Sequence, residues 1–139
     1  MPHLDIQRIR RSAVAILAGF LADTLGTILV LGAVFLAYGI SVGQEGADQV
    51  NRLAAWLPFQ VFEFALGVFY TGFGGFVAAR MVEERRMLHA IAVAALSTLL
   101  ALLTDRSTTL AWPLYLGCAL SFPAAVVGAT VAERKKAQR

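Results

Sequence analysis

The feature that most constrains this chain is the apolar stretch at residues 56–79, WLPFQVFEFALGVFYTGFGGFVAA. A transmembrane helix needs about 20 consecutive, predominantly apolar residues, and this stretch is long enough. Three further stretches of similar character lie at residues 12–40, 87–104 and 110–132. Together they predict an all-α integral membrane protein, whose single domain is a bundle of four transmembrane helices.

The composition argues against a soluble protein. Hydrophobic residues make up 58% of the chain and charged residues 15%, whereas soluble domains are about 45–50% apolar and about 25% charged. A chain of this size cannot bury so much apolar surface in a water-facing globule, so the lipid bilayer is its expected partner. The net charge of +3 does not predict nucleic-acid binding, because no basic patch interleaved with aromatic residues is present.

The positions of Lys and Arg predict the orientation of the bundle. The leader at residues 1–11, the turn at 80–86 and the tail at 133–139 carry three, three and four of them. The polar loops at residues 41–55 and 105–109 carry one each. Because cytoplasmic loops are enriched in Lys and Arg, we expect two helical hairpins with both termini in the cytoplasm. Residues 41–55 are then an outer loop or a short surface helix.

Two acidic residues, Asp23 and Glu63, fall inside predicted spans, where a charged side chain costs about 2.5–3.5 kcal/mol. Such residues usually face the interior of a bundle. Counted from the ends of their spans at roughly 1.5 Å per residue, the two lie at similar depths, so we expect that they can meet. Thr27 shares a helical face with Asp23, and Gln60 and Tyr70 share one with Glu63. These five residues form a candidate intramembrane polar site.

Two interpretations of this polar site stay open. In one, the acids and their neighbours form a hydrogen-bonded clasp between helices, and the protein is a structural or accessory component. In the other, the carboxyls exchange a proton for a cation, and the protein is a small proton- or cation-coupled transporter or channel. The sequence favours the clasp, because neither acid lies beside a helix broken by glycine and proline, as in many transporter sites.

Small residues at spacings of three and four predict surfaces for helix packing. In lipid, close backbone approach through such residues is a main source of helix association. The second span carries Gly67, Thr71, Gly74 and Gly75, and the fourth carries Gly117, Ser121 and Gly128. These surfaces serve either packing within the bundle or association with a second copy or another membrane protein, and the sequence does not separate the two.

No pattern predicts an enzyme, a metal centre or a cofactor site. His89 follows the central turn, whereas Cys118 lies in a span entered from the opposite side, so a Cys–His pair is not expected. The single cysteine excludes an intrachain disulfide. The chain also has no zinc-binding helix motif, phosphate loop or nucleophile elbow.

Several short motifs are spread along the chain: DTLGT at residues 23–27, GGFVAAR at 74–80, LHA at 88–90, PLY at 113–115 and FPAAVVG at 122–128. In these motifs the chain resembles a group of small, uncharacterised four-helix bacterial inner-membrane proteins. The resemblance implies four spans and a location in a bacterial inner membrane. It implies no catalytic residue, because the group has no assigned activity.

Overall fold

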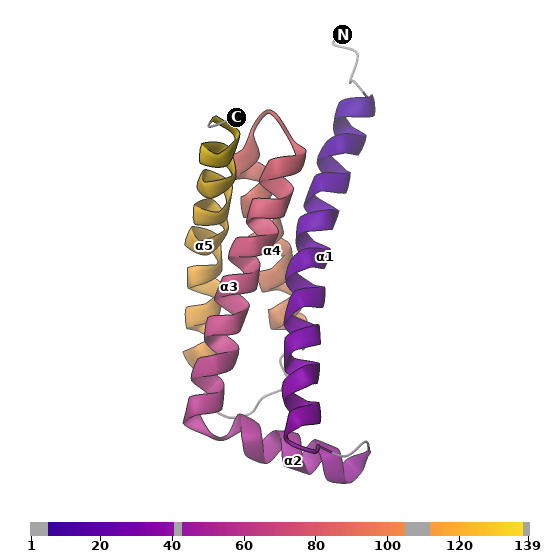
Figure 1. The fold of residues 1–139 in the computed structure, drawn as a ribbon, viewed down its shortest axis with the longest axis vertical. Coiled ribbons are helices and arrows are strands. Elements are labelled where there is room, and N and C mark those ends of the chain that lie inside the picture. Colours follow the sequence, from indigo (N-terminus) through magenta and orange to yellow (C-terminus); the bar gives the residue numbers. More distant parts are fainter. Residues whose placement is uncertain (1–5, 41–42, 105–111, 138–139) are drawn as a thin grey trace.

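The computed structural model describes residues 6–40, 43–104 and 112–137, and these residues contain five helices and no strand (Figure 1). The helices are α1 (Ile6–Ala37), α2 (Gln44–Ala54), α3 (Leu57–Met81), α4 (Arg86–Thr104) and α5 (Trp112–Ala137). Four helical segments are long and apolar enough to cross a membrane, namely α1, α3, α4 and the part of α5 at Leu114–Lys135. The predicted all-α class is thus confirmed for the described residues.

The first helix begins before the predicted span of residues 12–40 and ends at Ala37, three residues before the predicted end. α1 begins at Ile6, so it extends into the predicted polar leader. Its last turn closes in a Schellman motif, in which Gly39 has a φ of 65°. The N–H of Gly39 donates to the carbonyl oxygen of Leu36 at 3.0 Å, and the N–H of Ile40 donates to that of Phe35 at 3.0 Å. These bonds satisfy carbonyl groups that a helix end otherwise leaves unpaired.

The described connections between the long helices are a short helix and a tight turn. α2 occupies most of the stretch predicted as an outer loop and lies across one end of the bundle (Figure 1). α3 follows directly, with Pro58 in its first turn, where a missing N–H breaks no helical hydrogen bond. α3 and α4 are joined by a tight turn in which Arg85 adopts a φ of 52°. The second predicted outer loop, at residues 105–109, lies outside the described residues.

α3 is the central helix of the bundle. It contacts α1, α2, α4 and α5, and it runs antiparallel to α1 and α4 and parallel to α5 (Figure 1). α4 also contacts both α1 and α5, so these two helices flank the α3–α4 pair on opposite sides. A side chain on α3 can therefore reach a partner on any other long helix.

α1 and α3 approach each other through glycine. A Cβ added at Gly19 would lie 2.5 Å from the carbonyl oxygen of Gly74, and one added at Gly74 would lie 2.6 Å from that of Gly19. Cβ atoms essentially never come within 3.0 Å of a backbone atom. Glycine at both positions thus lets the two backbones touch directly.

α3 and α5 pack through a second set of small residues. A Cβ added at Gly75 would lie 2.6 Å from the carbonyl oxygen of Ala125, and one added at Gly128 would overlap the carbonyl oxygen of Gly72. This close contact runs along two parallel helices. The predicted small-residue surfaces of the second and fourth spans thus face each other within the bundle at these positions.

The other members of those surfaces make looser contacts. A Cβ added at Gly67 would meet no described neighbouring atom within 4 Å, and one added at Gly117 would lie 3.9 Å from the ring of Phe64. The hydroxyl of Ser121 donates to the carbonyl oxygen of Gly117 in its own helix at 2.8 Å. Close packing is therefore confined to particular positions of each helix.

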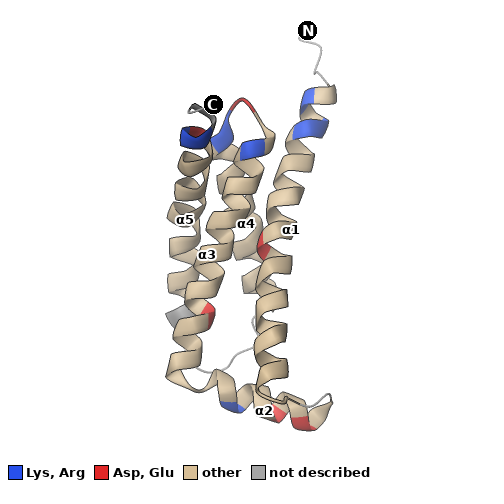
Figure 2. Ribbon diagram, in the orientation of Figure 1, with Lys and Arg blue, Asp and Glu red and all other residues tan. Residues whose placement is uncertain are grey.

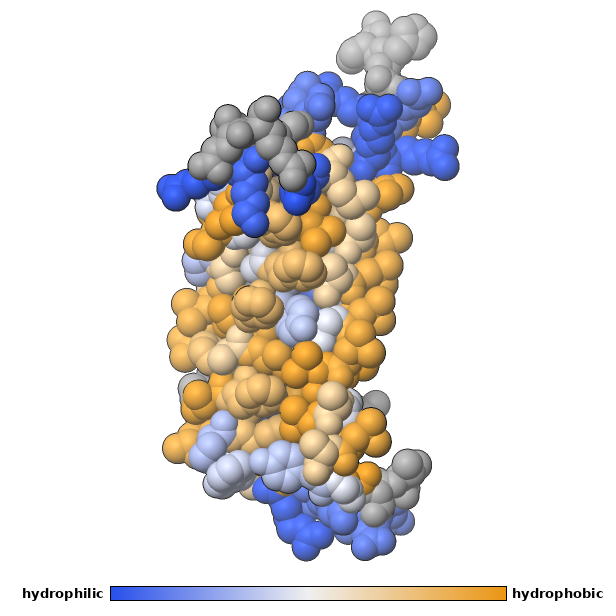
Figure 3. All heavy atoms as spheres, in the orientation of Figure 1, coloured by the Kyte–Doolittle hydropathy of each residue, from blue (hydrophilic) through white to orange (hydrophobic). Residues whose placement is uncertain are grey.

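Most of the buried side chains are small, and most of the large apolar ones lie on the outside. The buried cluster consists of alanines at 79, 90, 94, 125, 129 and 132. Leu29, Leu36 and Leu103 are 71%, 80% and 73% exposed. Figure 3 shows an apolar belt between two hydrophilic ends. Exposed apolar surface of this extent is unfavourable in water, whereas in lipid these side chains would face acyl chains.

We expect Gly75→Ala to destabilise the bundle and Gly67→Ala to leave its stability unchanged or raised. The added methyl group at Gly75 meets backbone that has to move, and overpacking of this kind typically costs about 1–3 kcal/mol. At Gly67 the same change meets open space and improves helix propensity. The measurement is the free energy of unfolding in mixed micelles of increasing sodium dodecyl sulfate content. Equal effects of the two substitutions would contradict the packing described.

Candidate functional site

Among the described residues, Asp23 is the most deeply buried acidic or basic residue, with 4% of its surface exposed. It lies midway along α1. Its Oδ2 atom accepts a hydrogen bond from the hydroxyl of Thr71 on α3 at 3.1 Å. The same oxygen accepts a second bond from the hydroxyl of Ser97 on α4. One carboxyl oxygen therefore joins three helices.

The surrounding glycines position this carboxyl group. Gly19 and Gly74 bring α1 and α3 together one turn away, and a Cβ added at Gly74 would lie 3.0 Å from the Cβ of Asp23. On the other side, the ring of Tyr70 occupies the space where a side chain at Gly26 would lie. Along α1, Asp23 therefore lies between a close backbone contact at Gly19 and an aromatic ring at Gly26. We refer to Asp23, Thr71 and Ser97 as the carboxyl clasp.

The remaining residues of the predicted site lie elsewhere or act locally. The hydroxyl of Thr27 donates to the backbone oxygen of Asp23 at 3.0 Å, within α1. The side-chain amide of Gln60 donates to the backbone oxygen of Ala54 at 2.9 Å, and so ties the start of α3 to the end of α2. Neither side chain bonds the carboxyl group of Asp23.

Glu63 does not meet Asp23, in contrast to the expectation from span depths. It lies eight residues before Thr71 on α3, which corresponds to about 12 Å along the helix axis. The depth estimate counted α1 from Ser12, whereas the helix begins at Ile6 and its alignment with α3 is set by the glycine contact. Glu63 is half-buried and makes no hydrogen bond or ion pair with another described residue.

Neither hydroxyl partner of Asp23 belonged to the predicted polar site: Thr71 was predicted only as a helix-packing residue, and Ser97 was not predicted at all. Ser97 lies in an apolar run with no acidic neighbour, and serine is common in transmembrane helices as a packing residue. Its pairing with Asp23 depends on α1 and α4 lying side by side and parallel. No local signal in α4 carries that information.

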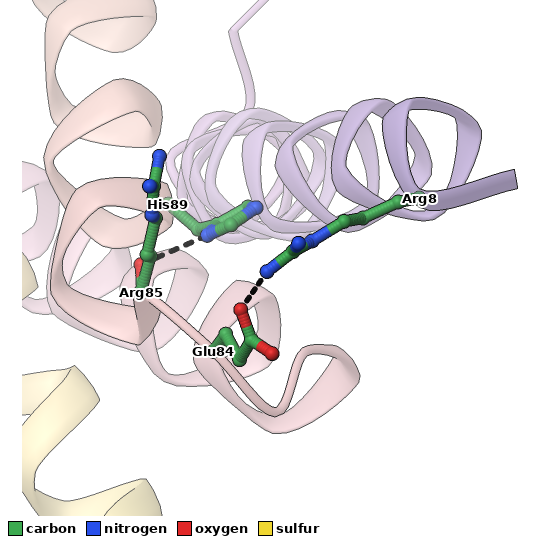
Figure 4. Close-up of polar contacts among 4 residues, drawn as sticks. All are labelled: Arg8, Glu84, Arg85 and His89. Atoms are coloured by element: carbon green, nitrogen blue, oxygen red, sulfur yellow. Dashed lines mark hydrogen bonds and ion pairs between the residues drawn. The ribbon is translucent and has the colours of Figure 1, made fainter. Parts of the chain in front are cut away.

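The residues considered for catalysis or metal binding lie apart. His89 is buried near the start of α4, and its Nδ1 atom donates to the backbone oxygen of Arg85 at 2.9 Å (Figure 4). Cys118 lies partly buried on α5. Among the described residues, no group of three or more His, Cys, Asp or Glu side chains is placed to hold a metal ion.

The architecture is that expected of a multi-pass membrane protein, with four membrane-length helices, three of which share a buried polar joint. No protein-family model matches the chain, and no curated protein or solved structure matches it. The resemblance to small bacterial inner-membrane proteins therefore stays a prediction.

The clasp predicts favourable energetic coupling between Asp23 and Ser97. In a double-mutant cycle of Asp23→Ala with Ser97→Ala, we expect a coupling energy of about 0.6–1.7 kcal/mol, the range of hydrogen bonds between membrane helices. The measurement is again the free energy of unfolding in mixed micelles. Ser121→Ala is the matched control, because that hydroxyl bonds only its own helix. A coupling at Ser97 no larger than that at Ser121 would contradict the clasp.

Proposed function

We propose that this protein is a structural or accessory integral membrane protein of a bacterial inner membrane, without catalytic activity or a cofactor. In this proposal it forms two helical hairpins with both termini and the α3–α4 turn in the cytoplasm. The distribution of charge supports the orientation. Most of the described Lys and Arg residues gather at the end of the bundle where α1 begins and α5 ends (Figure 2), and cytoplasmic loops have this bias.

The carboxyl clasp is the observation that carries the proposal. A translocation site needs a carboxyl that can exchange its ligand with water on each side of the membrane in turn. Asp23 is instead enclosed, and one of its oxygens is bonded by hydroxyls from two other helices. An arrangement of this kind holds helices in register and leaves the carboxyl unavailable to a substrate. The bundle thus provides a rigid apolar surface within the bilayer.

In the proposed accessory role, this exposed apolar surface is the part of the protein that contacts a partner. The most exposed of the large apolar side chains, among them Leu36 and Leu103, lie on the outside of the belt. Lipid covers such a surface by default, and a second copy or another membrane protein can cover part of it. We propose association of this kind as the role of the protein, and it requires no chemistry at Asp23.

Glu63 supports a second candidate, a small proton- or cation-coupled transporter or channel. It is a half-buried carboxyl on α3 without a bond to any described residue. Acidic residues inside membrane spans frequently belong to ion or proton pathways. In this candidate Glu63 is the group that binds the proton or cation, and Asp23 keeps its structural role.

Proton flux in proteoliposomes separates the two candidates. We expect no flux above that of empty liposomes from the wild-type protein, because the clasp offers no exchangeable path through the bundle. The matched variants are Asp23→Asn, Glu63→Gln and the double substitution, each checked by gel filtration for folding. Wild-type flux that Glu63→Gln abolishes and that Asp23→Asn spares would overturn the structural proposal in favour of transport at Glu63.

A further inference from the structure

A hollow lies between the start of α1 and the end of α3, at the arginine-rich end of the bundle. It has a volume of about 420 Å³ and is lined by Gln7, Arg10, Arg11, Val14 and Met81. Two guanidinium groups and an amide form its polar part, and two apolar side chains form the rest. A site with this division fits an amphipathic ligand with a negatively charged head.

The neighbouring ion pair leaves the two arginines of the hollow available. Arg8 pairs with Glu84 of the α3–α4 turn and so ties the first turn of α1 to the bundle (Figure 4). Arg10 and Arg11 are exposed, and neither makes an ion pair with a described residue. Guanidinium groups bind phosphate through paired hydrogen bonds, which makes arginine well suited to phosphate recognition.

An apolar stripe continues from the hollow along α1. Val14, Leu17, Leu21 and Leu25 follow Arg10 at helical spacings of three and four, and all four are exposed. From Val14 to Leu25 the stripe spans about 16 Å at roughly 1.5 Å per residue. This is about half of the roughly 30 Å hydrocarbon core. The stripe thus has the length of one leaflet.

We propose that this hollow binds an anionic phospholipid, whose phosphate contacts Arg10 and Arg11 and whose acyl chain lies along the stripe from Val14 to Leu25. The proposal rests on the membrane location proposed above. Figure 3 shows the hydrophilic end of the bundle bordering directly on the apolar belt, which is the level of lipid headgroups. Basic residues at this level attract anionic lipids.

Other charged positions fit such a ligand less well. Lys135 lies over the ring of Phe76 at 5.7 Å and is engaged in a cation–π contact. The hollow at the opposite end of the bundle is lined by a single arginine, Arg52, and the helix that carries it also holds Glu45 and Asp48. The general bias of Lys and Arg toward the cytoplasm does not account for a hollow with an apolar stripe below it.

Lipid binding to the detergent-purified protein tests the proposal. The probes are phosphatidylglycerol and phosphatidylcholine with identical acyl chains, titrated and detected as adducts by native mass spectrometry. We expect the wild type to bind phosphatidylglycerol at least about tenfold more tightly than phosphatidylcholine. The double variant Arg10→Gln/Arg11→Gln is expected to lose this preference. The control Arg134→Gln/Lys135→Gln removes the same amount of charge and is expected to keep the preference.

Several outcomes would overturn the proposal. Absence of a preference in the wild type would show that the hollow does not select anionic lipid. Equal loss in both double variants would reduce the preference to general charge attraction. Displacement of phosphatidylglycerol by equimolar glycerol phosphate would assign the hollow to a free anion. Val14→Asn/Leu17→Asn keeps both arginines, and unchanged lipid affinity in this variant would exclude the stripe. A thermal unfolding transition at the wild-type temperature in every variant confirms that the variants fold.

The orientation in the membrane is tested independently of the lipid. In a Cys118→Ser background, we expect a membrane-impermeant maleimide to label Glu45→Cys in intact cells and Glu84→Cys only after permeabilisation. Both positions are exposed. The reverse labelling would contradict the proposed orientation, whereas loss of the lipid preference with this labelling intact would contradict the lipid site alone.

Discussion

The direct contact of backbones at Gly19 and Gly74 is the constraint on which the rest of the structure depends. It fixes the distance between α1 and α3 and their alignment along the bundle axis. Asp23 lies one turn further along α1, so this alignment places its carboxyl opposite Thr71. Because α4 packs against both helices, Ser97 completes the clasp. A side chain at either glycine would move all three partners apart.

The bundle inverts the pattern of a soluble protein. Its buried cluster is made of alanine, and most of its large apolar side chains lie outside. In lipid there is little hydrophobic drive to bury such side chains, so association relies on close packing and on polar contacts between helices. The glycine and alanine contacts of α3 supply the packing, and the clasp supplies a polar contact whose alternative in hydrocarbon is an unsatisfied group. α3 takes part in both.

The class of fold was predictable from sequence, because the length of an apolar run is set by the thickness of the bilayer and needs no knowledge of neighbours. The buried position of Asp23 followed from the cost of an acid in hydrocarbon. The hydrogen-bond partners of its carboxyl, Thr71 and Ser97, could not be predicted from the sequence. Span depth gives an uncertain register, and a shift of two turns separates Glu63 from Thr71. The role of Ser97 could not be predicted because the parallel pairing of α1 with α4 is a property of the assembled bundle. The apolar faces of these helices carry no strong periodicity that reveals it.

The most direct test of the carboxyl clasp is chemical modification with a carbodiimide that partitions into the bilayer, followed by mass spectrometry of the modified peptides. The enclosed Asp23, whose carboxyl accepts two hydrogen bonds, is expected to stay unmodified in the wild type, while Glu63, which bonds no other described residue, reacts. Combined replacement of the clasp hydroxyls, Thr71→Val and Ser97→Ala, is expected to make Asp23 reactive. Modification of Asp23 in the wild-type protein as fast as Glu63 would show an accessible carboxyl and contradict the closed structural joint.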